Sequence, residues 1–290
     1  MAHRAIVPDE AGAGTVGLGW REEEGECEVS TELIRNMPSA EYFALRRVSK
    51  SGLDRLARSP AHMRAPSGEE TKAMRIGKAL HALALEGIAP VVRPEFAGTG
   101  SRAARAEWDA AHEGVTILSE DDAAQVHSMA ASIAMHPVAG PALRRADGIA
   151  EASILWTCPD TGAECKSRLD WLLPGIVLDL KTTADARPDA FARSVASYRY
   201  HVQDAFYSQA AASAGLAIEH FVFVVVESAP PFAVALYQLD DAAREEGRRL
   251  YLRDLETYMR CMERDEWPAY PTDIQTLSLP RWAYRGDENE

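Results

Sequence analysis

The chain has 290 residues, of which 47% are hydrophobic and 26% are charged, which is enough for a sizeable core in one large domain. It contains no apolar run long enough to span a bilayer and no signal-peptide pattern, so we expect a cytoplasmic protein without membrane contact. The formal net charge of −13 is unusual for a nucleic-acid-binding protein, although a local basic groove can exist on an acidic surface.

The first part of the chain predicts a flexible arm followed by helices. Residues 9–28 are rich in Gly and Glu and poor in bulky apolar positions, so we expect residues 1–40 to form a loose arm. Ser49 and Ser51 are candidate caps for a short helix that stops at Pro60. Apolar residues then recur at helical spacing in three further segments: 69–87, which ends at Gly87, 101–113 and 119–135.

From residue 150 the periodicity changes to that of strands. Three segments alternate apolar and polar residues: 150–158, 163–173 and 176–182. A helical segment (188–214), two strands (221–227 and 232–239) and a charged helix (240–265) follow. This order predicts an α/β fold with an antiparallel meander at its start. We expect the main domain to cover 41–265 and the tail, 266–290, to pack on it.

The four cysteines predict no metal centre. Cys27, Cys158, Cys165 and Cys261 form no CxxC pair, so we expect small buried or half-buried thiols in a reducing compartment. Cys158 and Cys165 flank a predicted turn and could pair, but too few further ligands lie nearby for a zinc or iron–sulfur site.

The register of the predicted hairpins brings acidic residues together. A two-residue loop at Pro174-Gly175 places Asp170 directly opposite Asp179, with Cβ atoms roughly 5 Å apart. Lys181 projects from the same face as Asp179. A turn through residues 159–162 similarly places Glu151 opposite Asp170. The opposite face is apolar and predicts a core surface: Leu169, Trp171, Leu173, Ile176, Leu178 and Leu180.

A row of three carboxylates indicates a metal site. Like charges on neighbouring strands repel, and a divalent cation would remove that conflict. Oxygen ligands suit Mg²⁺, with Mn²⁺ as the other option, and Lys181 could orient a water or stabilise charge on a phosphate. The simpler interpretation is an exposed polar face with charges there by chance.

Several other polar residues are ambiguous by spacing alone. His81 lies one helical turn after Gly77, and a lone histidine on such a helix is more often packed than a ligand. Gly77 in a helix suggests close approach to another backbone. Gln203 and Tyr207 lie one helical turn apart on one face, and an ordinary polar helix face shows the same spacing. Two cations on the face of Asp170 could contact DNA phosphates or neutralise the carboxylates: Lys166 and Arg168.

Together these motifs resemble the RecE (exonuclease VIII) family of phage-type PD-(D/E)xK exonucleases, and more broadly the RecB-type nucleases. The resemblance runs from about Tyr42 to Tyr207 through the segments VSKSGLDRLARSPAHM, IGKALHALALEG, EASILW, CKSRLDWLL, IVLDLKTT and YRYHVQDAFY. A single D-x-K motif would be weak, whereas the ordered set is specific. It implies a restriction-endonuclease-like core, αβββαβ, with a mixed sheet flanked by helices and with N-terminal helical additions.

The resemblance also implies roles for individual residues. It implies that His81, Asp170, Asp179 and the Leu180 carbonyl bind the metal, with Glu151 assisting. Lys181 would be the catalytic lysine, and Gln203 and Tyr207 would order the site or the DNA strand. The implied activity is 5′→3′ digestion of one strand at double-stranded DNA ends, leaving 3′ overhangs for a RecT-type annealing protein. Relatives form ring-like tetramers, so a homo-oligomer is expected. The arm and the acidity of this chain depart from the family pattern.

Two alternatives remain open at this point. One is a catalytically silent module that binds DNA ends or a partner on the nuclease fold. The other is a related nuclease of different polarity or with endonuclease activity. The sequence does not choose between one and two metal ions.

Overall fold

The structure is a computed structural model that describes residues 15–16, 31–66, 68–95, 101–112 and 115–279. Most of the predicted arm, together with Cys27 and residues 280–290, lies outside these described residues. Among the described residues, no helix combines the length and apolar character that crossing a bilayer requires.

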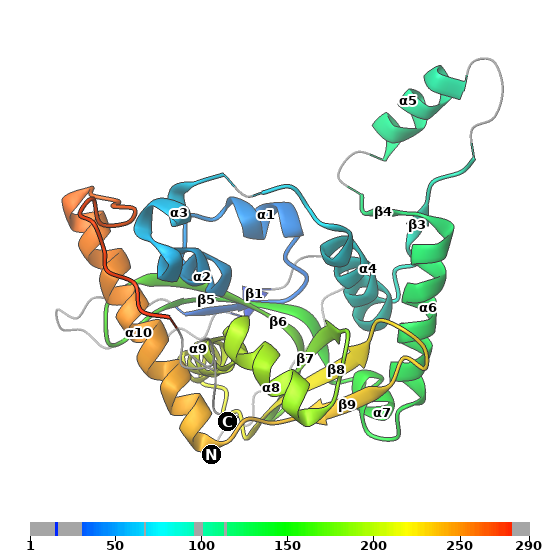
Figure 1. Ribbon diagram of the computed structural model, residues 1–290. Helices are drawn as coiled ribbons and strands as arrows, with labels where there is room; N and C mark the ends of the chain where they lie inside the picture. The colour runs from blue at the N-terminus through cyan, green and yellow to red at the C-terminus, as the bar shows by residue number, and fades with distance from the viewer. Residues whose placement is uncertain (1–14, 17–30, 67, 96–100, 113–114, 280–290) are drawn as a thin grey trace, which may run out of the picture.

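A mixed sheet forms the centre of the fold (Figure 1). In the described part of the chain it has seven strands, ordered β1-β2-β5-β6-β7-β8-β9, and only the β7–β8 pair is parallel. Its strands are β1 (Thr15–Val16), β2 (Glu32–Ile34), β5 (Ile149–Thr157), β6 (Glu164–Leu173), β7 (Ile176–Thr183), β8 (His220–Glu227) and β9 (Val234–Tyr237). Two short strands pair separately: β3 (Val91–Val92) and β4 (Ile117–Leu118).

Helices cover both faces of the sheet (Figure 1). One face packs against α2 (Lys50–Arg58), α8 (Pro188–Ser197), α9 (Tyr200–Ser213) and α10 (Asp241–Arg264). The other face packs against α4 (Lys72–Glu86), α6 (Glu120–Met135) and α7 (Ala139–Leu143). The remaining helices are α1 (Ser39–Ala44), α3 (Pro60–Arg64) and α5 (Ser101–Ala111), and α5 projects away from the body.

Two hydrophobic cores follow from the alternation of side chains along the strands. Val177 faces the core under α2, α8, α9 and α10, whereas Leu178 and Leu180 face the core under α4 and α6. Strands covered on both faces bury most of their residues, which explains why β8 is almost entirely apolar. The prediction of one core face and one polar face was therefore too simple, because the face of Asp170 and Asp179 is also covered.

The predicted apolar face is confirmed except at Leu169. Trp171, Leu173, Leu178 and Leu180 share one core, whereas Leu169 packs into the other core. The β6–β7 ladder pairs residues 171–173 with residues 176–178 and ends before Asp170. We attribute the change of side at Leu169 to the local parting of the strands there.

Local sequence signals explain the ends of the main elements. The Pro174-Gly175 loop joins β6 to β7 with Gly175 at φ +78°, as the hairpin register requires. Ser49 caps α2, and Gly87 ends α4 with φ +71°. The predicted helix 188–214 is two helices, because Arg199 adopts φ +55° between α8 and α9.

The described cysteines are buried free thiols, as expected: Cys158, Cys165 and Cys261. The described tail, residues 266–279, has no helix or strand.

One glycine prediction is wrong, and another glycine carries the packing role instead. A Cβ atom on Gly77 would meet nothing within 4 Å, so no neighbouring backbone requires a glycine there. A Cβ atom on Gly247 of α10 would lie 2.0 Å from the backbone oxygen of His201 in α9. Gly247 therefore permits the close contact between these two helices.

We predict opposite stability changes for alanine at these two glycines. Gly247→Ala should lower the free energy of unfolding by about 1–3 kcal/mol or more, because the methyl group overpacks the α9–α10 contact. The matched control Gly77→Ala should raise it by about 0.5–1 kcal/mol through helix propensity. Urea unfolding followed by circular dichroism measures both, and a Gly247→Ala protein as stable as the native chain would contradict the packing.

Candidate metal site and active site

Asp170 lies where strands β6 and β7 separate. Its Oδ2 accepts a hydrogen bond from the backbone N–H of Leu180 at 2.8 Å. The carboxylate thus satisfies a backbone donor beyond the end of the ladder, and Asp170 is only 8% exposed. This contact fixes Asp170 against the segment that carries Asp179 and Lys181.

Glu151 lies within strand β5, at a position where the pairing with β6 is interrupted. The β5–β6 register continues unchanged on both sides of it, from Ala150↔Trp171 to Ala152↔Leu169, as the sequence predicted. Glu151 itself has φ +48°, a conformation that is strained for a residue with a Cβ atom. Such strain is typical of functional positions, and here it accompanies a carboxylate placed beside Asp170.

His81 reaches the two carboxylates from helix α4. Its Nδ1 atom lies 3.6 Å from Asp170 Oδ2 and 3.9 Å from Glu151 Oε1. Its Nε2 atom donates to the backbone oxygen of Leu180 at 3.0 Å. Four residues distant in the sequence therefore converge on one point, and His81 belongs to the site rather than to an ordinary helix surface.

The donor set fits a divalent cation. One ligand atom each from His81, Glu151 and Asp170 lies within 4.8 Å of the others. Burial lowers the pKa of His81, but Asp170 and Glu151 outweigh burial and raise this pKa to about 9. The position thus attracts positive charge strongly, and imidazole with two carboxylates is a ligand set that divalent metals accept.

Asp179 occupies the adjoining, more deeply buried position. It is 0% exposed, forms an ion pair with Lys181 and accepts a hydrogen bond from Gln203 Nε2 at 2.5 Å. Burial raises the pKa of Asp179 to about 6, Lys181 opposes this shift, and Asp170 adds to it. Burial lowers the pKa of Lys181, but the Asp179 and Asp170 carboxylates outweigh burial, so the ammonium form is favoured.

The expected metal ligands and the observed group differ in part. Among the described residues, the group that could hold an ion consists of His81, Glu151 and Asp170. Glu151, expected only to assist, is a full member. Asp179 is not in this group; its carboxylate contacts Gln203 and Lys181, and the Leu180 carbonyl accepts from His81.

Lys166 and Arg168 both donate to backbone carbonyls; the buried Lys166 is not placed to contact a phosphate, whereas Arg168 lines the cavity beside Glu151 and its phosphate contact stays a prediction. Lys166 is 5% exposed, and its ammonium donates to the carbonyls of Tyr42 and Leu45 at 2.7 and 2.9 Å. Arg168 donates to the Met37 carbonyl at 2.8 Å and lies 3.9 Å from Glu151. Both cations also lie over the Tyr42 ring, so they fasten α1 to the sheet, and Arg168 alone also pairs with Glu151.

Helix α9 supplies the residues that close the site from one side. Gln203 donates to the Asp179 carboxylate, as described above. Burial raises the pKa of the Tyr207 phenol, and four acidic neighbours add to the increase: Tyr42, Asp179, Asp170 and Glu151. Tyr207 follows Gln203 by four positions on the same helix, and the role that the resemblance implies for it stays a prediction.

Sequence reasoning missed two residues on the Lys181 side. The ammonium of Lys181 lies 4.9 Å from the ring centroid of Tyr200, and that of Lys50 lies 5.7 Å from the same ring. Tyr200 precedes Gln203 by three positions, so helical spacing could have placed it near the site. Nothing in the local sequence marks Lys50, which arrives from α2 through the tertiary fold.

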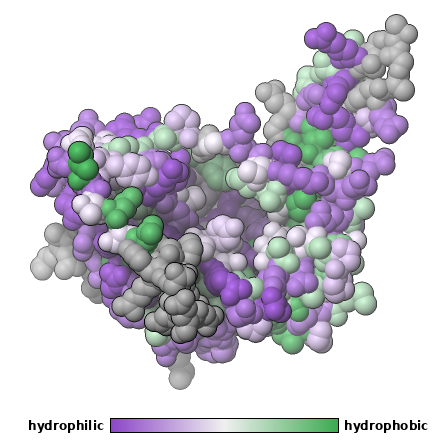
Figure 2. Space-filling model, viewed as in Figure 1, coloured by the Kyte–Doolittle hydropathy of each residue, from purple (hydrophilic) through white to green (hydrophobic). Residues whose placement is uncertain are grey.

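The space around these residues is open to solvent. The molecular surface is hollowed between helices α1–α3 and α4, and hydrophilic residues line part of the hollow (Figure 2). A cavity of about 430 Å³ lies beside the carboxylates and is lined by Glu151, Arg168, Ser39 and Glu86, among others. Glu151 is the member of the His81, Glu151 and Asp170 group that borders this cavity.

Comparison with known proteins places this geometry in a family. Residues 47–280 match the family model described as a PDDEXK-like domain of unknown function. None of the curated proteins matches the chain at a significant level.

Solved structures support the fold. A crystal structure from Eubacterium rectale, described as a candidate exonuclease, superimposes with a TM-score of 0.56 at 15% identity, covering 84% of this chain and 96% of that one. The structure of the protein SSO0001 gives a TM-score of only 0.28 at 17% identity, covering 63% and 86%, and supports no argument. The sheet flanked by helices is thus a restriction-endonuclease-like fold, and the chain belongs to the PDDEXK-like domain family that its residues 47–280 match.

Proposed function

We propose that the protein is a Mg²⁺-dependent nuclease that digests linear double-stranded DNA from its ends. The observation that carries this proposal is the convergence of His81, Glu151 and Asp170 beside the buried Asp179–Lys181 pair. A purely structural role would not favour this crowding of carboxylates, because each one raises the cost of ionising its neighbours. Membership of the PDDEXK-like family supports the same chemistry.

His81, Glu151 and Asp170 would hold the ion, which, when bound, would supply Lewis-acid stabilisation of a phosphate and a more acidic water. The chain's own residues do the positioning. Gln203 fixes one oxygen of Asp179, and Asp179 in turn holds the Lys181 ammonium in place. Because its pKa is raised, Lys181 acts as a cationic donor toward the scissile phosphate rather than as a general base.

The finer features of the proposal rest on the resemblance to the RecE family. We infer 5′→3′ polarity, 3′ single-stranded products for a RecT-type annealing protein, and a homo-oligomer, with a tetramer as the expected form. Mn²⁺ should substitute for Mg²⁺, since the carboxylate donors suit both ions.

Metal binding should depend on Asp170. Mg²⁺ or Mn²⁺ at a hundred times its dissociation constant should stabilise the native chain by about 2.7 kcal/mol and raise its melting temperature. Asp170→Asn keeps an acceptor for the Leu180 N–H but loses a charge, so most of this stabilisation should disappear. Thermal unfolding with metal or chelator measures it. The control Asp147→Asn, at an exposed ion pair with Arg145, should respond like the native chain, and an unchanged response of Asp170→Asn would contradict the site.

Cleavage should depend on Lys181. Lys181→Ala should slow digestion of linear duplex at least about a hundredfold, because a charge aimed at the phosphate is lost, while DNA affinity stays nearly unchanged. Lys78→Ala removes a surface lysine paired with Glu70 and should cut normally. Rates of nucleotide release under single-turnover conditions decide the matter, and full activity in Lys181→Ala would refute the assignment.

The end preference can be tested with labelled duplexes. In Mg²⁺, a 5′ label should be released early while a 3′ label stays on a long strand, and a closed circular duplex should remain intact. Chelator should stop all digestion. Early loss of the 3′ label would reverse the proposed polarity, and cutting of the circle would show endonuclease activity instead.

A further inference from the structure

A second cavity adjoins the candidate active site. It has a volume of about 680 Å³, within the range of about 300–1,000 Å³ typical of ligand sites. It lies at the carboxyl ends of the parallel strands β7 and β8, where α/β proteins commonly bind ligands. Thr182 and Thr183, which directly follow Lys181, line it together with Gln125, Ser194, Tyr198 and Tyr200.

Two tyrosines form an aromatic wall of this cavity. The ring centroids of Tyr198 and Tyr200 lie 5.7 Å apart with an interplanar angle of 29°. Tyr200 is the inner ring, beside the Lys181 ammonium, and Tyr198 is the outer ring, with 62% of its surface exposed. An aromatic surface therefore extends from the catalytic lysine toward solvent, and its outer end has no cover in the described chain.

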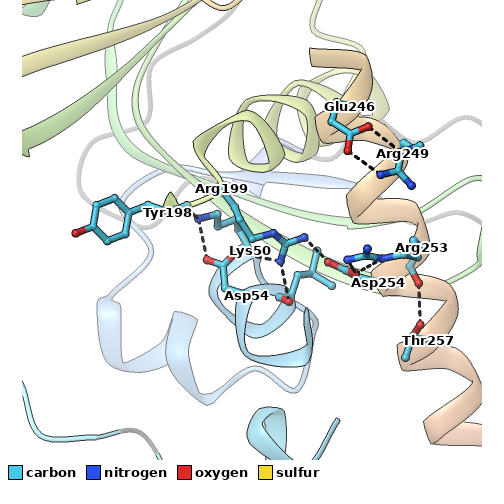
Figure 3. Close-up of polar contacts among 10 residues, drawn as sticks. Lys50, Asp54, Tyr198, Arg199, Glu246, Arg249, Arg253, Asp254 and Thr257 are labelled. Atoms are coloured by element: carbon cyan, nitrogen blue, oxygen red, sulfur yellow. Dashed lines mark hydrogen bonds and ion pairs between the residues drawn. The ribbon is translucent and has the colours of Figure 1, made fainter. Parts of the chain in front are cut away.

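Hydrogen bonds and ion pairs hold the turn that carries these rings (Figure 3). The ammonium of Lys50 donates to the Tyr198 carbonyl at 2.7 Å and pairs with Asp54 at 2.8 Å. The guanidinium of Arg199 donates to the Leu53 carbonyl at 3.2 Å and pairs with Asp54 and Asp254. In the close-up, the Tyr198 ring points away from this network, which joins α2 to α10.

The backbone at this turn is strained. Arg199 has φ +55°, which costs on the order of 1–3 kcal/mol for a residue other than glycine. Two ion pairs and a backbone hydrogen bond stabilise it, as described above. A strained turn that presents one exposed ring in a fixed position is a feature of a preorganised binding surface rather than of a simple helix junction.

We propose that this cavity holds an unpaired nucleotide of the DNA strand being cut, with its base stacked on Tyr198. The proposal rests on the proposed nuclease function for its choice of ligand. Tyrosine rings bind unstacked bases of any sequence, whereas bases within a duplex are already stacked on each other. The Thr182 hydroxyl on the β7 wall can bond to the sugar or phosphate, whereas those of Thr183 and Ser194 donate to the backbone carbonyls of Asp185 and Ala190. The end of the duplex would thus be frayed at the site.

A binding assay without metal separates this inference from cleavage. The full chain, in chelator, is titrated into a single-stranded oligonucleotide that carries 2-aminopurine, whose fluorescence falls on stacking. We expect quenching by the native chain and by Tyr198→Phe, and about tenfold weaker binding with little quenching for Tyr198→Ala. Tyr270→Ala, which removes a tyrosine of similar exposure (61%) from the tail, should behave like the native chain.

The outcomes distinguish the two proposals. Equal affinity and equal quenching for Tyr198→Ala and the native chain would overturn the stacking role, even if the protein digests DNA. Quenching lost in Tyr198→Ala, with no digestion by the native chain in Mg²⁺ or Mn²⁺, would support a single-strand binding site and overturn the nuclease proposal. A normal melting temperature for Tyr198→Ala shows that the loss is not one of folding.

Discussion

The hydrogen bond from the Leu180 N–H to Asp170 is the contact on which the site depends. It joins β6 to β7 beyond the last backbone pair of their ladder, so a carboxylate rather than a carbonyl connects the strands. The same parting of the strands leaves the Leu180 carbonyl free to accept from His81. Because the backbone of one residue, Leu180, contacts both Asp170 and His81, the position of the acid is coupled to that of the histidine on a separate helix.

The charges around this contact are arranged in two layers. His81, Glu151 and Asp170 lie at the more open side, whereas Asp179 is buried between Lys181 and Gln203. The two layers repel electrostatically, since Asp170 raises the pKa of Asp179. A cation in the outer layer relieves that repulsion and would favour ionised Asp179 and a firmly held Lys181. Metal binding and the orientation of the lysine are therefore linked through charge.

Much of this arrangement followed from strand patterns, and the rest required tertiary information. The hairpin register could be predicted because the Pro174-Gly175 loop fixes which residues lie opposite, and the observed pairs agree on both hairpins. No local sequence pattern indicates the strained backbone of Glu151 or the separation of the strands at Asp170. Lys166 and Arg168 looked like surface cations because the burial that α1 imposes on them is set by residues more than a hundred positions away.

The buried cations also bear on how an acidic chain could hold the nucleic-acid site proposed above. The net charge of −13 counts every residue, whereas the field at the site depends on nearby groups. Five cations lie around the carboxylates or under the turn that carries Tyr198 and Tyr200: Lys50, Lys166, Arg168, Lys181 and Arg199. Because these cations are little exposed, salt screens their interactions less than it screens interactions between surface charges. Most of them are already paired, so they offset the carboxylates without forming a strongly basic groove. Under the proposed function, a substrate strand would be held largely by the bound ion and by base stacking, and such binding needs fewer phosphate contacts than a basic protein makes. Its salt dependence should accordingly be shallow compared with that of basic DNA-binding proteins.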